Sequence, residues 1–283
     1  MRMHVKVLGP SGTFGHEVSI LSAEWLREQF GDFRVDFVED NAAILKAAAY
    51  NKCVGIVPLW NPDAGLVKGV TDFLLRQHKG FKSSIIGVRK LRVRHQLLVH
   101  RSVKRRGQIR EVMSHPHALG QCDKVLSAMN LWTRRRTTST AKAAQLVAHD
   151  KRFRTTAAIA SQLAADTYRA DLKVWKHDIE DSPDNFTRFY IWGPHPTRPT
   201  GQDRTALIFR TENKPGRLWR ELEPIRAEHT NLSTIRQISA DDASESAFYC
   251  EFDGHRYSDS GRRILREMNK AGHVMVLGSW PIA

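Results

Sequence analysis

The sequence predicts an α/β protein with two lobes, followed by a smaller ferredoxin-like βαββαβ domain. Three observations lead to this prediction. Short apolar runs alternate with helical patterns through the first 193 residues, a segment rich in proline follows, and the order of strands and helices then changes. Strand–helix alternation favours a mostly parallel sheet with right-handed crossovers.

The first lobe is expected to contain residues 1–80 and a return segment at 177–193. A strand at 4–8 leads into the glycine-rich turn GPSGTF, and apolar residues at helical spacing predict a helix at 16–30. A strand at 35–38, an alanine-rich helix over EDNAAILKAAAY and a strand at 53–60, which Asn61-Pro62 ends, follow. The return segment ends in a strand at 187–192.

The second lobe is expected at residues 81–176. Its predicted strands are 93–99, 110–113, 134–138, 155–160 and 172–176, and its predicted helices are 117–129, 140–149 and 161–168. Ligands of open α/β sheets bind at the carboxyl ends of the strands, so we expect a ligand in the cleft between the lobes.

A linker separates this domain, residues 1–193, from the rest. The segment GPHPTRPTGQD holds three prolines and two glycines, so residues 194–203 are predicted to be irregular. The last domain, 204–283, is about the size of a small regulatory or dimerising module. It is predicted from strands at 205–210, 232–239, 246–253 and 273–279 and helices at 216–228 and 259–271.

Composition indicates a globular protein of the cytoplasm, with 41% hydrophobic and 26% charged residues. No apolar run is long enough to cross a membrane, and the N-terminus does not resemble a signal peptide. Cys53, Cys122 and Cys250 are far apart and outside metal or disulfide patterns, so we expect buried thiols and neither a disulfide framework nor a metal site.

The net charge of +14 is the unusual global feature. Nine Lys/Arg and no Asp/Glu lie between Arg89 and Arg110, and Arg134, Arg135 and Arg136 form a second cluster. A nucleic-acid surface is one interpretation. A solvated basic face on a protein with an anionic small ligand is the other, and it is favoured because no nucleic-acid-binding motif accompanies the charge.

Three segments could bind an anion. In GPSGTF, Gly9 and Gly12 permit a tight turn whose N–H groups could hold a negative charge, although such turns more often only end a strand. Ser114 in SHPHALGQC is a natural N-cap, and Ser139 or Thr140 in STAKAA would cap the next helix, leaving N–H groups for a carboxylate. His115 and His117 are not expected to bind a metal, since no further ligand has suitable spacing.

The stretch DNFTRFYIW places Thr187 beside Arg188 at the start of a strand. Successive strand residues point to opposite faces, so one side chain could face the cleft while the other lines its rim. A hydroxyl can donate a hydrogen bond to a leaving oxygen, and a guanidinium can hold a carboxylate through two parallel bonds.

Taken in order, six motifs and the segment NKPGRLWRELEPI resemble prephenate dehydratase followed by its ACT domain, from Gly9 to Pro281. The motifs are GPSGTF, VPLWNPDAGLVKGVTDFLL, SHPHALGQC, STAKAAQLVA, AAIASQLAADTY and DNFTRF. The most specific of these is Asn185-Phe186-Thr187-Arg188-Phe189. The resemblance implies a periplasmic-binding-protein-like catalytic domain, no cofactor, and a homodimer or homotetramer.

The resemblance also implies a reaction and its residues. Family members convert prephenate, a dicarboxylate, to phenylpyruvate with loss of carbon dioxide and water, on the way to phenylalanine. Thr187 matches the threonine that assists departure of the ring hydroxyl, and Arg188 would hold a substrate carboxylate. The positions implied to contact substrate are Asn61, Ser114, Ser139, Thr140, Phe189, Gly12 and Thr13.

The chain departs from the family at two places. Trp60 and Pro62 replace a glutamate and a Ser/Thr beside Asn61, which predicts a less polar cleft wall. In the ACT segment, Gly216-Arg217-Leu218-Trp219 replaces the effector signature GALV, and Arg236-Gln237-Ile238-Ser239 replaces ESRP. We therefore expect Gly216, Leu218, Arg236 and Gln237 to form a degenerate effector site without feedback inhibition by phenylalanine.

Two alternatives remain open at this stage. A specialised enzyme of the same scaffold could act on prephenate or arogenate, or could decarboxylate without forming an aromatic ring, although retention of Thr187 argues against the latter. A non-catalytic ligand-binding or regulatory protein would be a different class, and only the altered cleft and the charge favour it.

Overall fold

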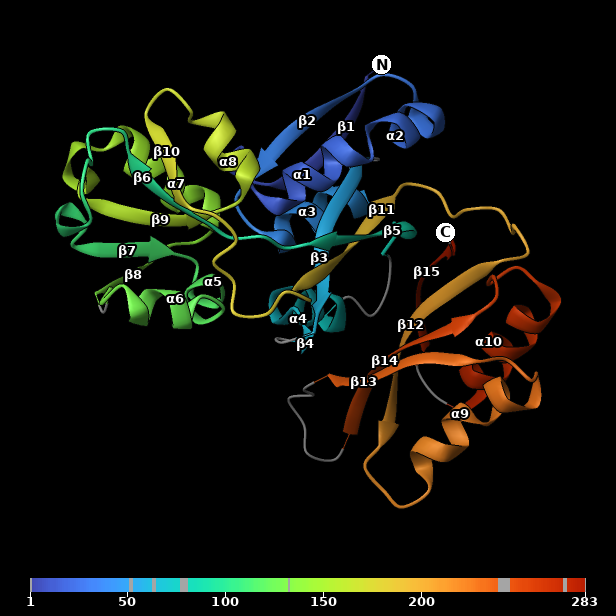
Figure 1. Cartoon of the computed structure of the whole chain (residues 1–283). Coiled ribbons are helices and arrows are strands. Elements are labelled where there is room, and N and C mark those ends of the chain that lie inside the picture. Colours follow the sequence, from blue (N-terminus) through green and yellow to red (C-terminus); the bar gives the residue numbers. More distant parts are fainter. Residues whose placement is uncertain are drawn as a thin grey trace. The chain divides into compact units, whose positions relative to one another are not determined.

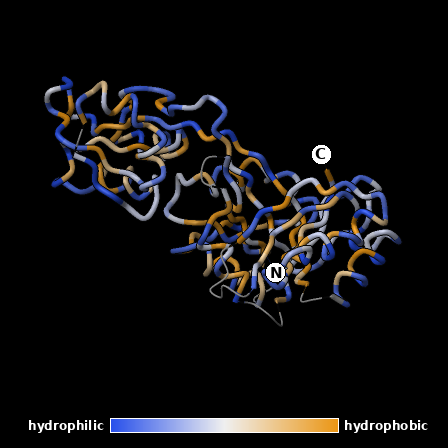
Figure 2. Tube along the Cα trace, turned by 90° about the horizontal axis from the view of Figure 1, so that it is seen from below, coloured by the Kyte–Doolittle hydropathy of each residue, from blue (hydrophilic) through white to orange (hydrophobic). Residues whose placement is uncertain are grey.

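The structure is a computed structural model that describes residues 2–50, 53–62, 65–76, 81–131, 133–238, 245–271 and 274–282. The chain forms two compact units. The first contains Met1–Ile44, Ile56–Gly65 and Lys90–Phe189, and the second contains Leu45–Gly55, Leu66–Arg89 and Tyr190–Ala283. Apolar stretches of the chain lie mostly in the interior of the trace, and hydrophilic stretches lie mostly along its outer turns (Figure 2).

One sheet of the first unit holds the start of the chain (Figure 1). Strands β1 (Met3–Leu8) and β2 (Phe33–Val38) are parallel, with Val5 opposite Val35, and β3 (Val54–Asn61) lies on the other side of β1. Strand β11 (Phe186–Gly193) lies next to β3. The predicted strand at 187–192 is therefore present as β11, whereas the return segment 177–193 as part of the first lobe stays a prediction.

The predicted helix at 16–30 is two helices, α1 (Phe14–Leu21) and α2 (Ala23–Phe30). Ser22 ends the first because its N–H still bonds to the Val18 carbonyl while its own backbone is no longer helical. The predicted helix at 117–129 is likewise divided, into α5 (Pro116–Gly120) and α6 (Asp123–Ala128). Periodicity continues across both breaks, so it could not show them.

The second sheet of this unit has the order β10-β6-β9-β7-β8. Its strands are β6 (Gln96–His100), β7 (Glu111–Ser114), β8 (Arg134–Arg136), β9 (Thr156–Ala160) and β10 (Leu172–Lys176). Strands β7, β8 and β9 are parallel, whereas β6 is antiparallel to both of its neighbours. Five predicted strands of the second lobe are thus confirmed, within a few residues at their ends.

Alternate residues of this sheet build two cores. Leu97 and Val99 belong to a cluster with α5 and α6, whereas Leu98 and Met113 pack against α7 (Thr140–His149) and α8 (Gln162–Thr167). Short 3-10 turns, η1 (Arg106–Gln108) and η2 (Lys151–Phe153), connect the layers at one end. Both faces of the sheet are covered at its centre, which explains why the central strand β9 is buried along its whole length.

The second unit contains the C-terminal domain. Its elements are β12 (Asp203–Glu212), α9 (Arg217–Ala227), β13 (Leu232–Ile238), β14 (Glu245–Asp253), α10 (Asp259–Ala271) and β15 (Val274–Pro281). The strand order β15-β12-β14-β13 confirms the ferredoxin-like arrangement. Positions 239 and 273 of two predicted strands, and Ser239 of the effector segment, lie outside the described residues.

Further elements lie wholly or partly in the second unit, and most of them were not predicted from the sequence. Strand β5 (Ser84–Arg92) lies beside β15, where Gly278 is opposite Ile85, and α3 (Asn41–Tyr50), β4 (Gly65–Leu66) and α4 (Lys68–Arg76) precede it. Only α3 was expected. The division into domains at 193 and 204 stays a prediction. Among the described residues, no helix is both long and apolar enough to cross a membrane.

Candidate active site around Asn61 and Thr187

Asn61 and Thr187, the two most specific site predictions, are in direct contact. Asn61 ends β3, Thr187 lies near the start of β11, and the neighbouring strands bring the Asn61 Nδ2 atom within 3.2 Å of the Thr187 Oγ1 atom. The same nitrogen lies 2.8 Å from the Phe186 carbonyl oxygen. Because an amide nitrogen cannot accept, the Thr187 oxygen is the acceptor here, and the two hydrogens of Asn61 Nδ2 are shared among this oxygen, the Phe186 carbonyl and Asn185 Oδ1.

The hydrogen of the Thr187 hydroxyl is therefore available for another partner. Among the described residues, no acceptor for it is present, and the side chain is only partly buried. A donor held in this way can bond to an oxygen on which negative charge develops.

Asn185 organises the same face of β11. Its Oδ1 atom accepts from Asn61 Nδ2 and from Gln121 Nε2, each at 3.1 Å, and only 2% of the residue is exposed. Two donors on one oxygen fix the amide orientation. Its Nδ2 atom is buried and has no partner among the described residues.

His95 extends this network into the core. With Gln121 Nε2 directed at Asn185, the Gln121 Oε1 atom lies 3.1 Å from His95 Nε2, which must then carry the hydrogen. Burial lowers the pKa of His95, so the ring is neutral near pH 7. Neutral donors and acceptors thus support Asn61 and Thr187 without a buried charge.

Sequence reasoning missed Asn185, Gln121 and His95 as parts of the site. Asn185 and Gln121 stand in motifs that carried the family resemblance, and this was the available signal. His95 had none, because a histidine in a strand pattern is more often a packed core residue.

Trp60 does not line the face on which Thr187 lies. Its ring is 5.4 Å from that of Phe186, and the Lys90 Nζ atom lies 3.8 Å above the same Phe186 ring. Successive strand residues alternate, so Trp60 and Phe186 occupy the face opposite Asn61 and Thr187. The predicted loss of polarity beside Asn61 is therefore wrong for Trp60.

Arg188 and Phe189 differ in exposure. Arg188 is partly buried, and the alternation places it on the face of Phe186. Phe189 is 3% exposed and lies beside Gly15, so it packs in the core. Contact of either residue with substrate stays a prediction.

The GPSGTF turn uses its glycines for packing. The Gly9 N–H donates to the Val38 carbonyl, and the Gly12 N–H donates to His16 Nδ1. Gly12 has φ +93°, and a Cβ there would lie 2.8 Å from Ala164 Cα. These two N–H groups are thus bonded within the protein, and binding of an anion by the turn as a whole stays a prediction.

Thr13 has a structural role in the same turn. Its hydroxyl donates to the Leu8 carbonyl and accepts from the His16 N–H, which caps α1. The residue is 3% exposed. Contact of Gly12 and Thr13 with substrate stays a prediction.

Ser114 and Ser139 stand at neighbouring strand ends. Ser139 caps α7 by accepting from Lys142 N–H at 3.1 Å, as expected, and its oxygen lies 3.4 Å from the Gly9 carbonyl. Thr140 is the first residue of that helix. Ser114 does not cap α5: it is fully buried and donates to the Ile159 carbonyl, while His115 occupies the cap position. Their contact with substrate is likewise untested.

The predicted effector positions lie in the second unit. Gly216, with φ +76°, precedes α9, and Leu218 packs against the core of that domain. The Arg236 side chain bonds to its own neighbour's carbonyl, and Gln237 Nε2 lies 3.5 Å from Ser246 Oγ. Whether they bind an effector stays a prediction.

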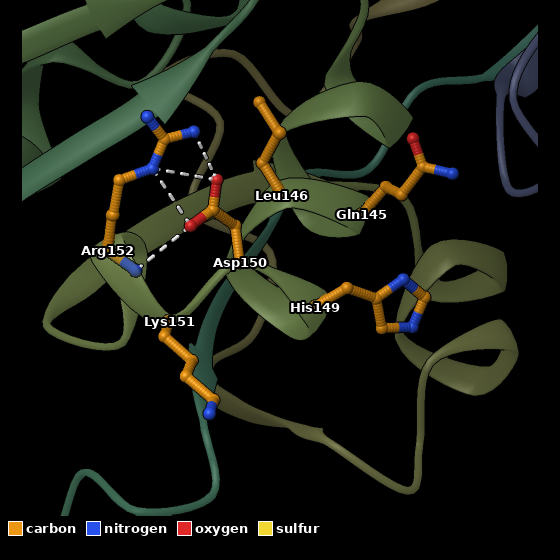
Figure 3. Close-up of a pocket in the computed structure, with 6 residues that line it drawn as sticks. All are labelled: Gln145, Leu146, His149, Asp150, Lys151 and Arg152. Carbon is orange, nitrogen blue, oxygen red and sulfur yellow. Dashed lines mark hydrogen bonds and ion pairs between the residues drawn. The ribbon is translucent and has the colours of Figure 1, made fainter.

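The described residues form no cluster of metal-ligating side chains, and a hollow lies away from this network. Among the described residues, no three His, Cys, Asp or Glu side chains gather at metal-ligand distances. A shallow hollow of about 680 Å³ lies at the end of α7, lined by Gln145, Leu146, His149, Asp150, Lys151 and Arg152 (Figure 3). It contains none of the predicted site residues.

Comparison with known proteins shows which family this chain is similar to. The family model for prephenate dehydratase matches residues 5–197. A bifunctional chorismate mutase/prephenate dehydratase of Aquifex aeolicus is 31% identical over 292 residues, covering 100% of this chain and 74% of that protein. The prephenate dehydratase of Methanocaldococcus jannaschii is 28% identical over 282 residues and covers 96% of each chain.

A solved structure shows the same fold. The prephenate dehydratase of Arthrobacter aurescens, in complex with L-Phe, superposes with a TM-score of 0.84 at 24% identity, covering 99% of this chain and 90% of that one. The family match, the relatives and the fold agree with one another, and the chain therefore belongs to the prephenate dehydratase family.

Proposed function

We propose that the protein converts prephenate to phenylpyruvate with loss of carbon dioxide and water. The observation that carries the proposal is the Asn61–Thr187 contact, in which the Thr187 oxygen accepts and its hydrogen remains available. Membership of the family supports it, because relatives that match most of the chain are named prephenate dehydratases.

The chemistry requires help at one atom. The electrons of the carbon–carboxylate bond move into the ring as carbon dioxide leaves, and the ring C–O bond breaks with its electron pair on oxygen. The Thr187 hydroxyl would donate a hydrogen bond to that departing oxygen. Asn61 and Asn185 would keep the threonine in place, since preorganised donors need no rearrangement during bond breaking.

The test is turnover by purified protein supplied with prephenate or, separately, with arogenate. Appearance of phenylpyruvate from prephenate is the expected result. If an aromatic product forms from arogenate and not from prephenate, arogenate is the substrate in place of prephenate. Consumption of prephenate without an aromatic product would indicate a non-aromatising decarboxylase, and absence of turnover of both would overturn the proposal.

We further propose that phenylalanine does not regulate this enzyme through its C-terminal domain. Arg217, where the family signature has a small residue, lies between Glu212 and Glu221, at 3.7 and 3.9 Å. Trp219 is 66% exposed. A small apolar binding surface is thus replaced by an ion-paired cluster and an exposed indole, and an effector acts only through different affinities for two states.

Calorimetry with phenylalanine tests this second proposal. We expect no heat of binding up to millimolar concentration and unchanged prephenate turnover in its presence. Binding at micromolar concentration, or inhibition at that concentration, would contradict it.

A further inference from the structure

The excess of positive over negative charge in this protein is confined to one part of the chain. Residues 81–176 hold 21 Lys/Arg against 5 Asp/Glu, a charge of +16. The remainder holds 23 against 25, a charge of −2, so the whole excess of +14 lies in that segment. A charge that served only solubility would not need to be concentrated in this way.

The register of the second sheet gathers four of these cations in a row. Arg169 precedes β10, Arg101 follows β6, Arg154 precedes β9 and Arg110 precedes β7, and these four strands are consecutive neighbours. The antiparallel pairing of β6 places its last residue at the same end as the first residues of the other three. We call these four residues the arginine row.

Contacts within the structure support this placement. Arg101 Nε donates to the Arg169 carbonyl at 2.8 Å, and Arg110 N–H donates to the Thr155 carbonyl at 3.0 Å, directly after Arg154. All four side chains are exposed. Strands lie about 4.8 Å apart, so the row spans about 14 Å.

Two of the four acidic groups near this end, Asp150 and Glu111, form ion pairs with arginine. Asp150 is held by Arg152, as Figure 3 shows, and Glu111 by Arg135, while Asp171 lies 3.9 Å from His149. Asp166 accepts from Gln162. Among the described residues, no member of the arginine row forms an ion pair. Lys104, Arg105 and Lys151 add exposed charge beside it.

The row is at the wrong end of the sheet to serve the small substrate. Ser114 is the last residue of β7, and Ser139 and Ser161 follow the carboxyl ends of β8 and β9. In the predicted substrate turn, the Gly9 carbonyl accepts from Ser139 and the Gly12 carbonyl accepts from Ser161. The arginine row is at the amino ends, about 16 Å away along a five-residue strand. The sequence-based explanation, an anionic small ligand, does not account for it.

We propose that the arginine row and its neighbouring cations bind the phosphate backbone of nucleic acid without sequence preference. A duplex presents one negative charge per about 3.4 Å along each strand, so one strand offers about four phosphate charges over the length of the row. Flexible guanidinium groups suit phosphate oxygens, and no base-reading element accompanies them. This activity is separate from the proposed dehydratase reaction.

The test is fluorescence anisotropy with a labelled 20-base-pair DNA of random sequence. Neutralising four phosphates predicts that the affinity falls by about 100-fold between 50 and 200 mM salt. The double variant Arg110→Glu/Arg154→Glu should bind at least about tenfold more weakly at 50 mM salt, with unchanged prephenate turnover and thermal midpoint. The control Arg220→Glu/Arg262→Glu changes the net charge equally, at exposed positions of the second unit, and should change affinity less than about twofold.

Three results would overturn the proposal. They are absence of DNA binding at 50 mM salt, equal losses in the two double variants, and binding to phosphatidylserine vesicles with none to the duplex. If the parent protein and both double variants do not turn over prephenate but the parent protein binds DNA, the proposed function is rejected and this inference stays in place.

Discussion

Thr187 shows what a single residue needs from its surroundings in this site. Its hydroxyl is defined by one donor, Asn61, and the donor is itself oriented by Asn185 and Gln121. The residue is partly exposed, as a residue that meets a ligand must be. The direction of one hydroxyl therefore depends on three amides.

Replacing Thr187 by alanine should lower kcat by about 100-fold or more while KM changes little, because the hydroxyl acts mainly as the C–O bond breaks. Thr187→Ser keeps the donor and should retain most of the activity. Steady-state kinetics with prephenate measures both. An unchanged kcat in the alanine variant would remove Thr187 from its proposed role.

A second residue-scale feature is a buried carboxylate in the other unit. Glu251 is fully buried and accepts from the hydroxyls of Tyr190 and Tyr249, and Arg204 lies 3.8 Å from its other oxygen. Burial raises the pKa of Tyr249 well above its usual value. The tyrosines therefore remain donors, and the carboxylate keeps the partners that a buried charge requires.

Tyr190→Phe should destabilise the protein by about 2 kcal/mol, because a charged acceptor loses one of its donors. Tyr257→Phe, which alters an exposed ring, is the matched control and should cost less than about 0.5 kcal/mol. Urea unfolding measures both free energies. Equal effects would show that the Tyr190 hydroxyl contributes nothing specific.

At the scale of elements, the close pairing of β15 and β5 depends on a glycine. A Cβ at Gly278, where φ is +150°, would lie 2.3 Å from the Ile85 nitrogen. Backbone on both sides leaves no flexible group to move aside. Gly69, in α4, is the opposite case, since nothing lies within 4 Å of a Cβ there.

Gly278→Ala should lower the free energy of unfolding by about 3 kcal/mol, through strain and separation of the two strands. Gly69→Ala should raise it by about 0.5–1 kcal/mol, because alanine loses less entropy in a helix. Thermal and urea unfolding of both variants provide the comparison. A tolerated alanine at 278 would mean that β15 and β5 are not held this close.

Helices and strands were predicted correctly where the spacing of apolar residues stays alternating or helical along the whole element. Strands such as 155–160 and helix 140–149 were predicted to within a residue of β9 and α7, because alternating or helical spacing is a local property. The breaks at Ser22 and between α5 and α6 were missed, since capping geometry and not periodicity ends those helices. Strand β5 was missed because its last six residues, GVRKLR, carry too many charges to be recognised as a core strand.

At the scale of the whole molecule, loss of hydration lowers the pKa of several histidines, of which His95 and His255 are buried. Burial is the largest cause of the lowered pKa of His16, His95, His100, His115 and His255. In the unfolded chain each binds a proton near its usual pKa of about 6.5, whereas in the folded protein it does so only at lower pH. The unfolded state therefore binds more protons in this range, and stability must fall as the pH decreases.

The free energy of unfolding should decrease between pH 7.5 and 5.5, and His95 alone should contribute about 1 kcal/mol per pH unit below its unfolded pKa. His95→Gln should make that slope shallower, whereas His177→Gln, at an exposed position, should leave it unchanged. Urea unfolding across the pH range measures the slopes. A His95→Gln slope equal to that of the parent protein would contradict the assignment.

The sequence by itself determined the class of fold, the order of the elements and the residues that mark the family, because these follow from local spacing and from motifs read in order. It also predicted that Asn61 and Thr187 belong to one site. Only the tertiary structure decided that Asn185 and Gln121 support them, that Trp60 lies on the other face, and that the Gly9 and Gly12 N–H groups are occupied. The same holds for the burial of Glu251 and for the arginine row. Each depends on the register between strands that are distant in the chain, and register is fixed by packing, which no local pattern contains.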